Sequence, residues 1–276
     1  MPTLLSPADI SACLRAHGIR PSRALGQHFL ADPNTARRIV RLAGVTEGDR
    51  VLEIGPGVGS LTLALADAGA HVHALEIDRH LIPVLEEMLE GRERVAVEQG
   101  DALTWDFFTL RDAPWSCVSN LPYNIATPVV LRVLEEAHAV TRMMVMVQQE
   151  VGERLAAAPR TKAYGAVTLK VEYRATARIV GSVPPTVFVP RPKVDSALVM
   201  LERRTTPPVD VPSSEGLFAL VNAGFSHRRK MLRRALTPVL GDRTADVLVS
   251  AGIAPSARAE ELDLGAWAAV ARAVAG

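Results

Sequence analysis

The tetrapeptide Asn120-Leu121-Pro122-Tyr123 combines residue types that could hold an aromatic amine. An exocyclic amine of adenine is a poor nucleophile because its lone pair is delocalised into the ring. The Asn120 side-chain oxygen and a main-chain carbonyl of Leu121 or Pro122 could accept its two N–H groups, and the fixed φ of proline would stiffen the loop. Tyr123 could then stack on the base. The alternative is a plain turn, since Asn and Pro are common turn residues.

A glycine-rich loop lies upstream, where the apolar run 51–55 leads into Gly55, Gly57 and Gly59. Glycines at the carboxyl end of a first parallel strand allow a ligand to approach the backbone closely. The spacing is G-x-G-x-G, whereas a dinucleotide site that binds pyrophosphate is expected to show G-x-G-x-x-G. Glu53 also lies within the strand and is a poor neighbour for a phosphate. The loop therefore favours a nucleoside ligand without a pyrophosphate.

Two acids follow the next two strand-like runs. Glu76 ends the second run and could accept hydrogen bonds from the hydroxyls of a ribose. Asp101, after the third run, is placed to accept from an adenine amine. Either acid alone could be structural, but the ordered series of the glycines, Glu76 and Asp101 at three consecutive strand ends predicts a nucleoside cofactor. A sulfonium methyl donor would suit this site because it is already a good leaving group, so that positioning is the main task and no metal is needed.

These residues require a parallel sheet to bring them together. Strand-like runs occupy 51–55, 71–77, 95–100, 115–120 and 143–149. Helix-like stretches occupy 60–68, 81–89 and 127–137, with Thr127 as the expected N-cap and Pro128 at the first helical position. Alternating strands and helices indicate an α/β fold with a mostly parallel sheet covered on both faces.

The remaining chain predicts a late hairpin and a small helical domain. The β-rich runs 167–180 and 194–201 flank a proline-dense segment and should form an antiparallel hairpin added to the sheet. Residues 203–214 have the composition of a linker, and 215–275 should contain three or four short helices. We therefore expect two domains, 1–204 and 205–276.

Composition excludes several classes of protein. The 276 residues are 48% apolar and 22% charged, which fits a folded chain with one substantial domain and a smaller one. No apolar stretch is long enough to span a membrane, and the N-terminus lacks the features of a signal peptide. Cys13 and Cys117 are too few for a disulfide framework or a zinc cluster. We expect a cytoplasmic protein without membrane or metal partners.

Charge is segregated although the net charge is only +1. Residues 11–45 carry six arginines and one acid, and residues 227–234 carry five fixed positive charges and no acid. Segregated positive charge can steer a polyanion to one face. Solvated helix faces are the alternative explanation. The candidate RNA-binding residues are Arg228, Arg229, Lys230, Arg233 and Arg234.

Together these motifs resemble the ribosomal RNA adenine dimethyltransferase family over nearly the whole chain, and the C-terminal segments resemble its small-subunit branch. The matching segments, in order, are LGQHFL (25–30), LEIGPGVGSLT (52–62), EID (76–78), GDAL (100–103), NLPYN (120–124), VFVPRPKVDS (187–196), FSHRRKMLRRAL (225–236) and RAEELDL (258–264).

The resemblance implies a Rossmann-like S-adenosylmethionine methyltransferase core over 1–204 and a small all-α RNA-binding domain over 205–276. It also implies that the protein is an enzyme whose substrate is 16S rRNA within the 30S ribosomal subunit, dimethylated at two adjacent adenines of the 3′-terminal hairpin loop. We expect it to act as a monomer. The implied contacts to S-adenosyl-L-methionine are Gln27, His28, Leu30, Gly55, Gly57, Glu76, Asp101 and Asn120.

Asn120, Pro122, Tyr123 and Phe188 would hold the target adenine. Phe188 lies in a proline-bounded loop and would cover the second face of the base, although a lone aromatic is more often part of a core. His28 stands where the family often has Asn, so protonation of His28 could make cofactor affinity depend on pH.

His227 and Met231 replace residues that are more commonly Gln and Thr, which leaves the basic register of this segment intact.

Three alternative functions remain open. One is a sister enzyme that methylates an adenine of 23S rRNA and confers macrolide resistance. Another is a ribosome-assembly factor that acts mainly by binding. The third, a nicotinamide-dependent dehydrogenase, is disfavoured by the glycine spacing.

Overall fold

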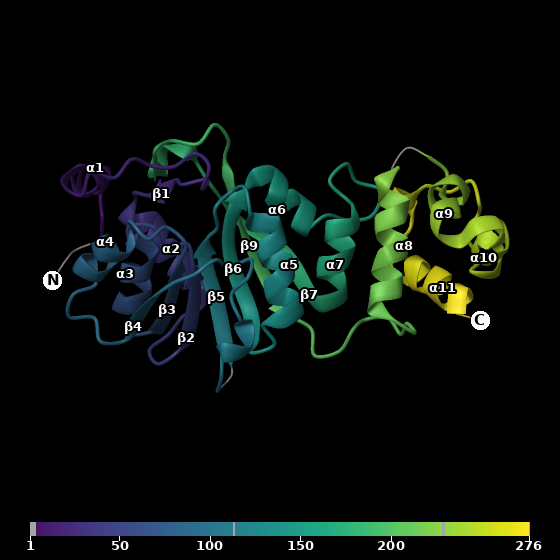
Figure 1. The fold of residues 1–276 in the computed structure, drawn as a ribbon, viewed down its shortest axis with the longest axis horizontal. Coiled ribbons are helices and arrows are strands. Elements are labelled where there is room, and N and C mark those ends of the chain that lie inside the picture. The colour runs from purple at the N-terminus through teal and green to yellow at the C-terminus, as the bar shows by residue number, and fades with distance from the viewer. Residues whose placement is uncertain (1–3, 113, 228–229, 276) are drawn as a thin grey trace. The chain divides into compact units, whose positions relative to one another are not determined.

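The computed structural model (Figure 1) describes residues 4–112, 114–227 and 230–275. By its internal contacts the chain divides into two compact units. The first contains the chain up to Glu153 together with Ala177–Arg203, and the second contains Arg154–Thr176 together with the chain from Arg204 onward. The division expected from the sequence, 1–204 and 205–276, places residues 154–176 in the first domain, whereas their contacts group them with the C-terminal helices.

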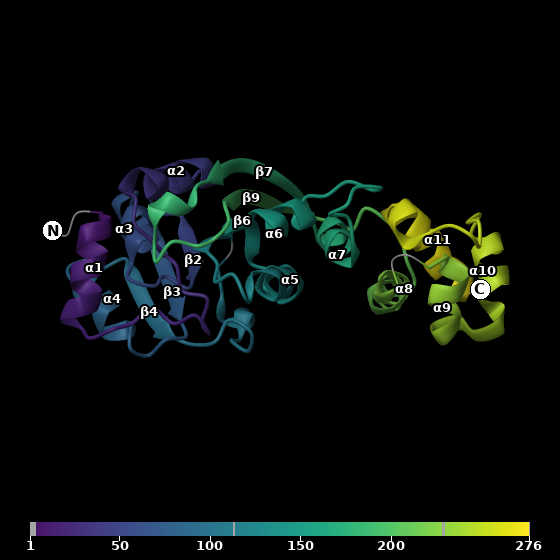
Figure 2. The same cartoon turned by 90° about the horizontal axis from the view of Figure 1, so that it is seen from above.

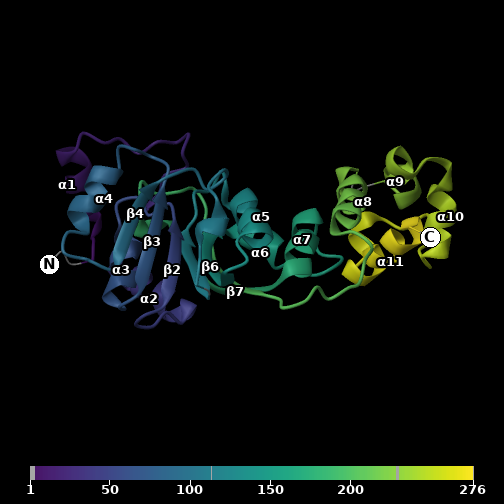
Figure 3. The same cartoon turned by 60° about the horizontal axis from the view of Figure 1, so that its bottom comes forward.

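The first unit is built on a seven-stranded sheet with the strand order β4-β3-β2-β5-β6-β9-β7. Its strands are β2 (Arg50–Ile54), β3 (His71–Glu76), β4 (Val95–Gln99), β5 (Trp115–Asn120), β6 (Val140–Gln148), β7 (Ala175–Val183) and β9 (Ser196–Arg203). The pairs from β4 to β6 are parallel, and β9 pairs antiparallel with β6. Figure 3 shows β4, β3 and β2 side by side. The predicted parallel sheet with a late antiparallel strand is therefore confirmed.

Central strands of this sheet are buried almost without interruption. In β6, residues 143–147 are all buried, as expected for a strand in a sheet covered on both faces. Figure 2 shows α2 and α5 on opposite sides of the strands. The helices up to residue 155 are α1 (Pro7–Ala16), α2 (Pro33–Ala43), α3 (Ser60–Asp67), α4 (Ile82–Met88), α5 (Ala126–Glu136) and α6 (Gln149–Leu155). Short elements nearby are β1 (Phe29–Leu30), β8 (Phe188–Val189) and the 3-10 turns η1 (Phe107–Thr109) and η2 (Pro185–Val187).

Two sequence predictions about helices need correction. Helix α5 begins at Ala126 with Ile125 as its N-cap, so Thr127 is not the cap. The segment 167–174, predicted as a strand, belongs to helix α7 (Ala166–Arg174), and β7 begins only at Ala175. The Thr168 hydroxyl accepts from the Gly165 N–H at 3.2 Å and donates to the Arg154 carbonyl at 2.7 Å, which fixes the start of this helix. Burial of Leu169 in the second core then outweighs the β-propensity of the segment.

The second unit is helical. In its described part, the region 215–275 contains four α-helices, as predicted: α8 (Ser214–Ser226), α9 (Leu232–Leu240), α10 (Thr244–Ser250) and α11 (Leu264–Ala275), with 3-10 turns η3 (Gly241–Arg243) and η4 (Ala259–Glu261). Trp267 and Tyr164 are its largest buried side chains, and the Tyr164 hydroxyl donates to the Leu262 carbonyl at 2.9 Å. Among the described helices, none is long and apolar enough to cross a membrane.

Candidate functional site

A cavity of about 810 Å³, counted with the space that opens to solvent, lies at the carboxyl ends of β2, β3, β4 and β5. The structure brings to this cavity all the residues predicted to contact the cofactor, and three of the four predicted to hold the base. Those lining it are Gln27, His28, Leu30, Gly55, Gly57, Glu76, Asp101, Asn120, Pro122 and Tyr123.

The glycine loop is packed closely by other segments of the chain. Gly55 and Gly57 both have positive φ, at +70° and +62°. A Cβ on Gly57 would lie 2.7 Å from Cδ1 of Phe29, and a Cβ on Gly55 would lie 3.2 Å from Cδ of Pro122. Glycine is therefore required here by backbone conformation and by the approach of two neighbouring segments.

Glu76 is held rigidly at the end of β3. Its side chain is 4% exposed, its Oε2 accepts from the Gly57 N–H at 3.0 Å, and its Oε1 accepts from the Asp78 N–H at 2.9 Å. Burial raises the pKa of Glu76, and these two N–H groups partly offset the rise. The carboxylate is thus fixed at the cavity wall, where its remaining lone pairs could accept hydrogen bonds from ligand hydroxyls.

A second buried acid, Glu53, lines the same cavity. It is 1% exposed, and burial, together with the nearby Glu76 carboxylate, raises its pKa to about 8. Within the described part of the chain, its Oε2 atom and the buried Ser60 Oγ have no hydrogen-bond partner. Buried polar atoms without partners are rare in folded proteins, so their place on a cavity wall indicates that a ligand or water completes them.

Asn120 ends β5 and connects the Asn120–Tyr123 loop to the N-terminal segment. Its Nδ2 donates to the His28 carbonyl at 3.0 Å, which leaves Oδ1 as the acceptor of this side chain. The Tyr123 hydroxyl shares a 2.6 Å hydrogen bond with Oγ of Ser196, a fully buried residue, and burial raises the pKa of Tyr123. The His28 and Tyr123 ring centroids are 5.2 Å apart. The loop residues are therefore oriented by partners far along the chain.

Further hydrogen bonds fasten the N-terminal segment 22–28 over the cavity. Gln27 Nε2 donates to Asp78 Oδ2 at 2.8 Å, and Asn124 Nδ2 donates to the Ala24 carbonyl at 2.9 Å. His28 Nδ1 donates to the Pro190 carbonyl at 2.8 Å. Asp78, Asn124 and Ser196 also support the site, and none of them was expected from the sequence. Each lies inside a matching motif, EID, NLPYN or VFVPRPKVDS, which was the available signal.

Phe188 is the one predicted base-holding residue that the structure does not bring to the cavity. It is 1% exposed, pairs with Leu30 between β8 and β1, and belongs to the core of the first unit. Stacking of Phe188 on a base would require its ring to leave this core, and that role stays a prediction.

The basic segment is partly described. Arg233 and Arg234 are exposed on α9, whose opposite face buries Leu232 and Leu236 in the core of the second unit, and Lys230 is exposed just before this helix. The predicted RNA-binding residues Arg228 and Arg229 lie outside the described residues. No group of three or more His, Cys, Asp or Glu side chains that could hold a metal occurs in the part of the chain that the structure describes.

The fold and the site define a Rossmann-like methyltransferase. A family model described as Ribosomal RNA adenine dimethylase matches residues 19–275, and the chain belongs to this family. The chain is 45% identical to "Ribosomal RNA small subunit methyltransferase A" of Acidothermus cellulolyticus over 98% of this chain and 94% of that protein. It is 47% identical to the protein of the same name from Cutibacterium acnes over 99% of this chain and 95% of that protein.

Solved structures show the same fold. The crystal structure of the 23S rRNA methyltransferase ErmE has a TM-score of 0.67 and 28% sequence identity, covering 90% of this chain and all of that one (100%). A dimethyladenosine transferase from Plasmodium falciparum has a TM-score of 0.73 and 24% identity, covering 88% of this chain and 96% of that one.

Proposed function

We propose that this protein transfers methyl groups from S-adenosyl-L-methionine to the N6 amines of two adjacent adenines in the 3′-terminal hairpin loop of 16S rRNA within the 30S subunit, giving N6,N6-dimethyladenosines. The observation that carries the proposal is the single cavity in which Glu76, Asp101 and the Asn120–Tyr123 loop meet. Membership of the adenine dimethylase family supports the reaction, and relatives named for the small subunit support the substrate.

The cavity residues fit the methyl donor. Bound S-adenosyl-L-methionine would supply a methyl group on a sulfonium that is already a good leaving group. The fixed Glu76 carboxylate would accept from the ribose hydroxyls, and Asp101 would accept from the adenine amine. The unpartnered Glu53 and Ser60 atoms on the same wall are polar groups that a bound cofactor or its water could complete.

At the target base, Asn120 would accept one N–H of the amine through Oδ1, because its Nδ2 is already bonded to His28. A main-chain carbonyl of Leu121 or Pro122 would accept the other. Tyr123, anchored through its hydroxyl, would offer its ring face to the base. The base must be turned out of its RNA stack, and stacking on an aromatic ring offsets about 1–3 kcal/mol of that cost. Phe188 would cover the second face if its ring leaves the core.

Positive charge on the second unit would supply affinity for RNA. Lys230, Arg233 and Arg234 are exposed, and Arg228 and Arg229 adjoin them in the sequence. Contacts of this kind to phosphates depend on salt and carry little sequence information. With a ribosomal substrate the protein would act in the cytoplasm, and we propose that it does so as a monomer.

The experiment that tests the proposal is transfer of labelled methyl from S-adenosyl-L-methionine to purified 30S subunits lacking the dimethyladenosines, with protein-free 23S rRNA alongside. Nucleoside analysis should find N6,N6-dimethyladenosine in the 30S sample alone. The structural likeness to a 23S rRNA methyltransferase makes label in 23S rRNA the specific alternative outcome. Cofactor binding without label in either RNA would favour a ribosome-assembly factor.

A further inference from the structure

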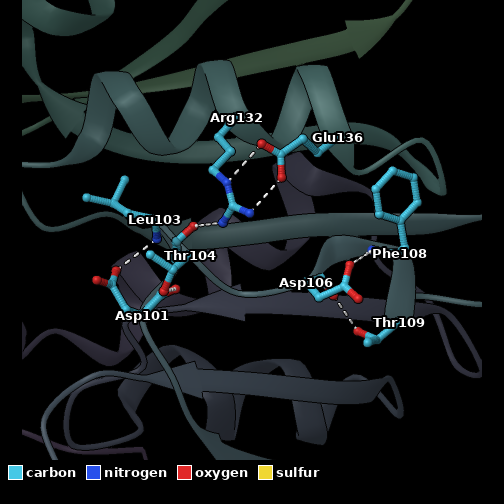
Figure 4. Close-up of polar contacts among 9 residues, drawn as sticks. Asp101, Leu103, Thr104, Asp106, Phe108, Thr109, Arg132 and Glu136 are labelled. Carbon is cyan, nitrogen blue, oxygen red and sulfur yellow. Dashed lines mark hydrogen bonds and ion pairs between the residues drawn. The ribbon is translucent and has the colours of Figure 1, made fainter.

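Helix α5 holds the turn that carries Asp101 through one side chain, Arg132 (Figure 4). Arg132 Nη1 donates to the Ala102 carbonyl at 2.7 Å. Ala102 is buried, lines the cavity and directly follows Asp101. The rest of the guanidinium is fixed by Glu136, one turn further along α5, through bonds of 3.0 Å from Nε and 2.6 Å from Nη2. The Arg132 side chain is therefore held in one conformation by its hydrogen bonds and its ion pair.

The same guanidinium touches the loop at a second point. Its carbon Cζ lies 4.9 Å from the ring centroid of Phe107, which is almost fully buried in η1. The Arg132 side chain is 18% exposed, so its hydrogen bond and its contact with the ring are both shielded from solvent. Arg132 thus fixes the 102–107 loop at both of its ends.

Bonds within the loop set its local shape but do not place it. Asp101 Oδ1 accepts from the Leu103 N–H at 2.8 Å, and Asp106 Oδ1 accepts from the Phe108 N–H at 2.9 Å (Figure 4). Both are short-range turns. The contact with Arg132 relates the loop to α5, the helix that follows the Asn120–Tyr123 loop in the chain. Trp105 Nε1 also ties the loop to β4 by donating to Glu98 at 2.7 Å, but Arg132 is the side chain of α5 that bonds the Ala102 carbonyl beside Asp101. The wall beside Asp101 and the Asn120–Tyr123 loop are therefore both connected to α5.

We infer that Arg132 is a positioning residue for recognition of the cofactor's adenine: by holding the Ala102 carbonyl it keeps the Asp101 carboxylate where it accepts the adenine amine. The inference rests on the proposed function, in which Asp101 meets that amine. It follows that Arg132 sets the preference for adenine over a base that carries an oxo group at the same position, because an oxo group would face the lone pairs of the carboxylate.

The test compares the affinity of the whole protein for S-adenosylhomocysteine with its affinity for S-inosylhomocysteine, in which an oxo group replaces the amine, by calorimetry. The wild-type protein should prefer the adenine compound on the order of 10- to 100-fold, as expected for a hydrogen bond to a charged group. Arg132→Met keeps an unbranched side chain but removes the guanidinium and its donors, and should reduce the preference to a few-fold. Arg132→Lys keeps one cationic donor for the Ala102 carbonyl and should be intermediate.

Arg142→Met is the matched control. Arg142 also ties a main-chain carbonyl, that of Gly44, at 3.1 Å, and bonds Ser116 Oγ at 2.9 Å, but it is not among the residues that line the cavity. The Arg142→Met variant should be less stable than the wild-type protein but should keep its preference for the adenine compound. An unchanged preference in Arg132→Met overturns the inference, and if that variant fails to fold, Arg132→Lys decides by the same comparison. Failure of the wild-type protein to bind S-adenosylhomocysteine would instead overturn the proposed function.

Discussion

Replacing Gly57 by alanine should damage the protein in two separable ways. The residue has a φ of +62°, and a side chain in this left-handed region costs about 1–2 kcal/mol. The new Cβ would also lie 2.7 Å from Cδ1 and 3.0 Å from Cε1 of Phe29, which is buried against the same core. Forcing such an overlap in a packed region costs roughly a further 1–3 kcal/mol. We therefore expect Gly57→Ala to lose about 2–5 kcal/mol of unfolding free energy.

Gly48→Ala separates the two contributions. Gly48 has a φ of +83°, but a Cβ there would meet nothing within 4 Å. This control should lose only the conformational part, about 1–2 kcal/mol, and keep its affinity for S-adenosyl-L-methionine. Gly57→Ala should in addition bind the cofactor at least about tenfold more weakly, since a shift of Phe29 displaces the neighbouring cavity residues and 1.4 kcal/mol suffices for that factor.

The assay is urea unfolding of both variants, followed by calorimetric titration with S-adenosyl-L-methionine. Equal losses of stability in Gly57→Ala and Gly48→Ala, with wild-type cofactor affinity in both, would refute the reasoning. That result would mean that Phe29 yields freely to the added methyl group, and that its contact with the glycine loop does not shape the cavity.

Three further predictions concern Glu53, Asn120 and the basic segment 227–234. Because burial raises the pKa of Glu53 to about 8 from 4.5, the folded state holds a proton that the unfolded state releases, so stability should fall as pH rises from about 4.5 to 8. Glu53→Gln should remove up to about 1.4 kcal/mol per pH unit of this fall in the free energy of unfolding, measured by urea unfolding at several pH values. The same pH dependence of stability in the wild-type protein and the variant would contradict the prediction. Asn120→Ala should abolish methyl transfer but leave 30S binding nearly intact; loss of both would show that Asn120 maintains the structure. Neutralising Arg229, Lys230 and Arg233 should weaken binding to all RNA sequences equally and reduce the dependence of the RNA affinity on salt concentration. An unchanged salt dependence would mean that these residues belong to a solvated helix face and do not bind RNA.

Strand ends could be predicted from the sequence because their signal is local. The apolar runs 51–55 and 115–120 correspond to β2 at 50–54 and β5 at 115–120. In a parallel sheet the residues at the carboxyl ends of neighbouring strands must meet at one edge. Correct strands therefore suffice to predict that Glu76, Asp101 and Asn120 share a cavity, without knowledge of any contact between them.

Other features depend on contacts that leave no local trace. The segment 167–174 has β-branched and aromatic residues suited to a strand, but burial of Leu169 in the second core decides for a helix. Phe188 is an apolar residue in a loop, and composition alone does not distinguish a base-stacking ring from one buried in a core. The bond between Tyr123 and Ser196 joins residues 73 positions apart, so neither motif reveals its partner in the other.

Residues 27–29 connect the glycine loop, the end of β3 and the Asn120–Tyr123 loop. Phe29 packs against the loop after β2, Gln27 bonds Asp78 after β3, and the His28 carbonyl accepts from Asn120 at the end of β5. One short segment thus contacts three strand ends of the sheet. Since the Asn120 donor is held by that segment, the orientation of its Oδ1 acceptor depends on the same segment that contacts the glycine loop and the end of β3. Displacement of the segment should therefore impair cofactor binding and amine recognition together.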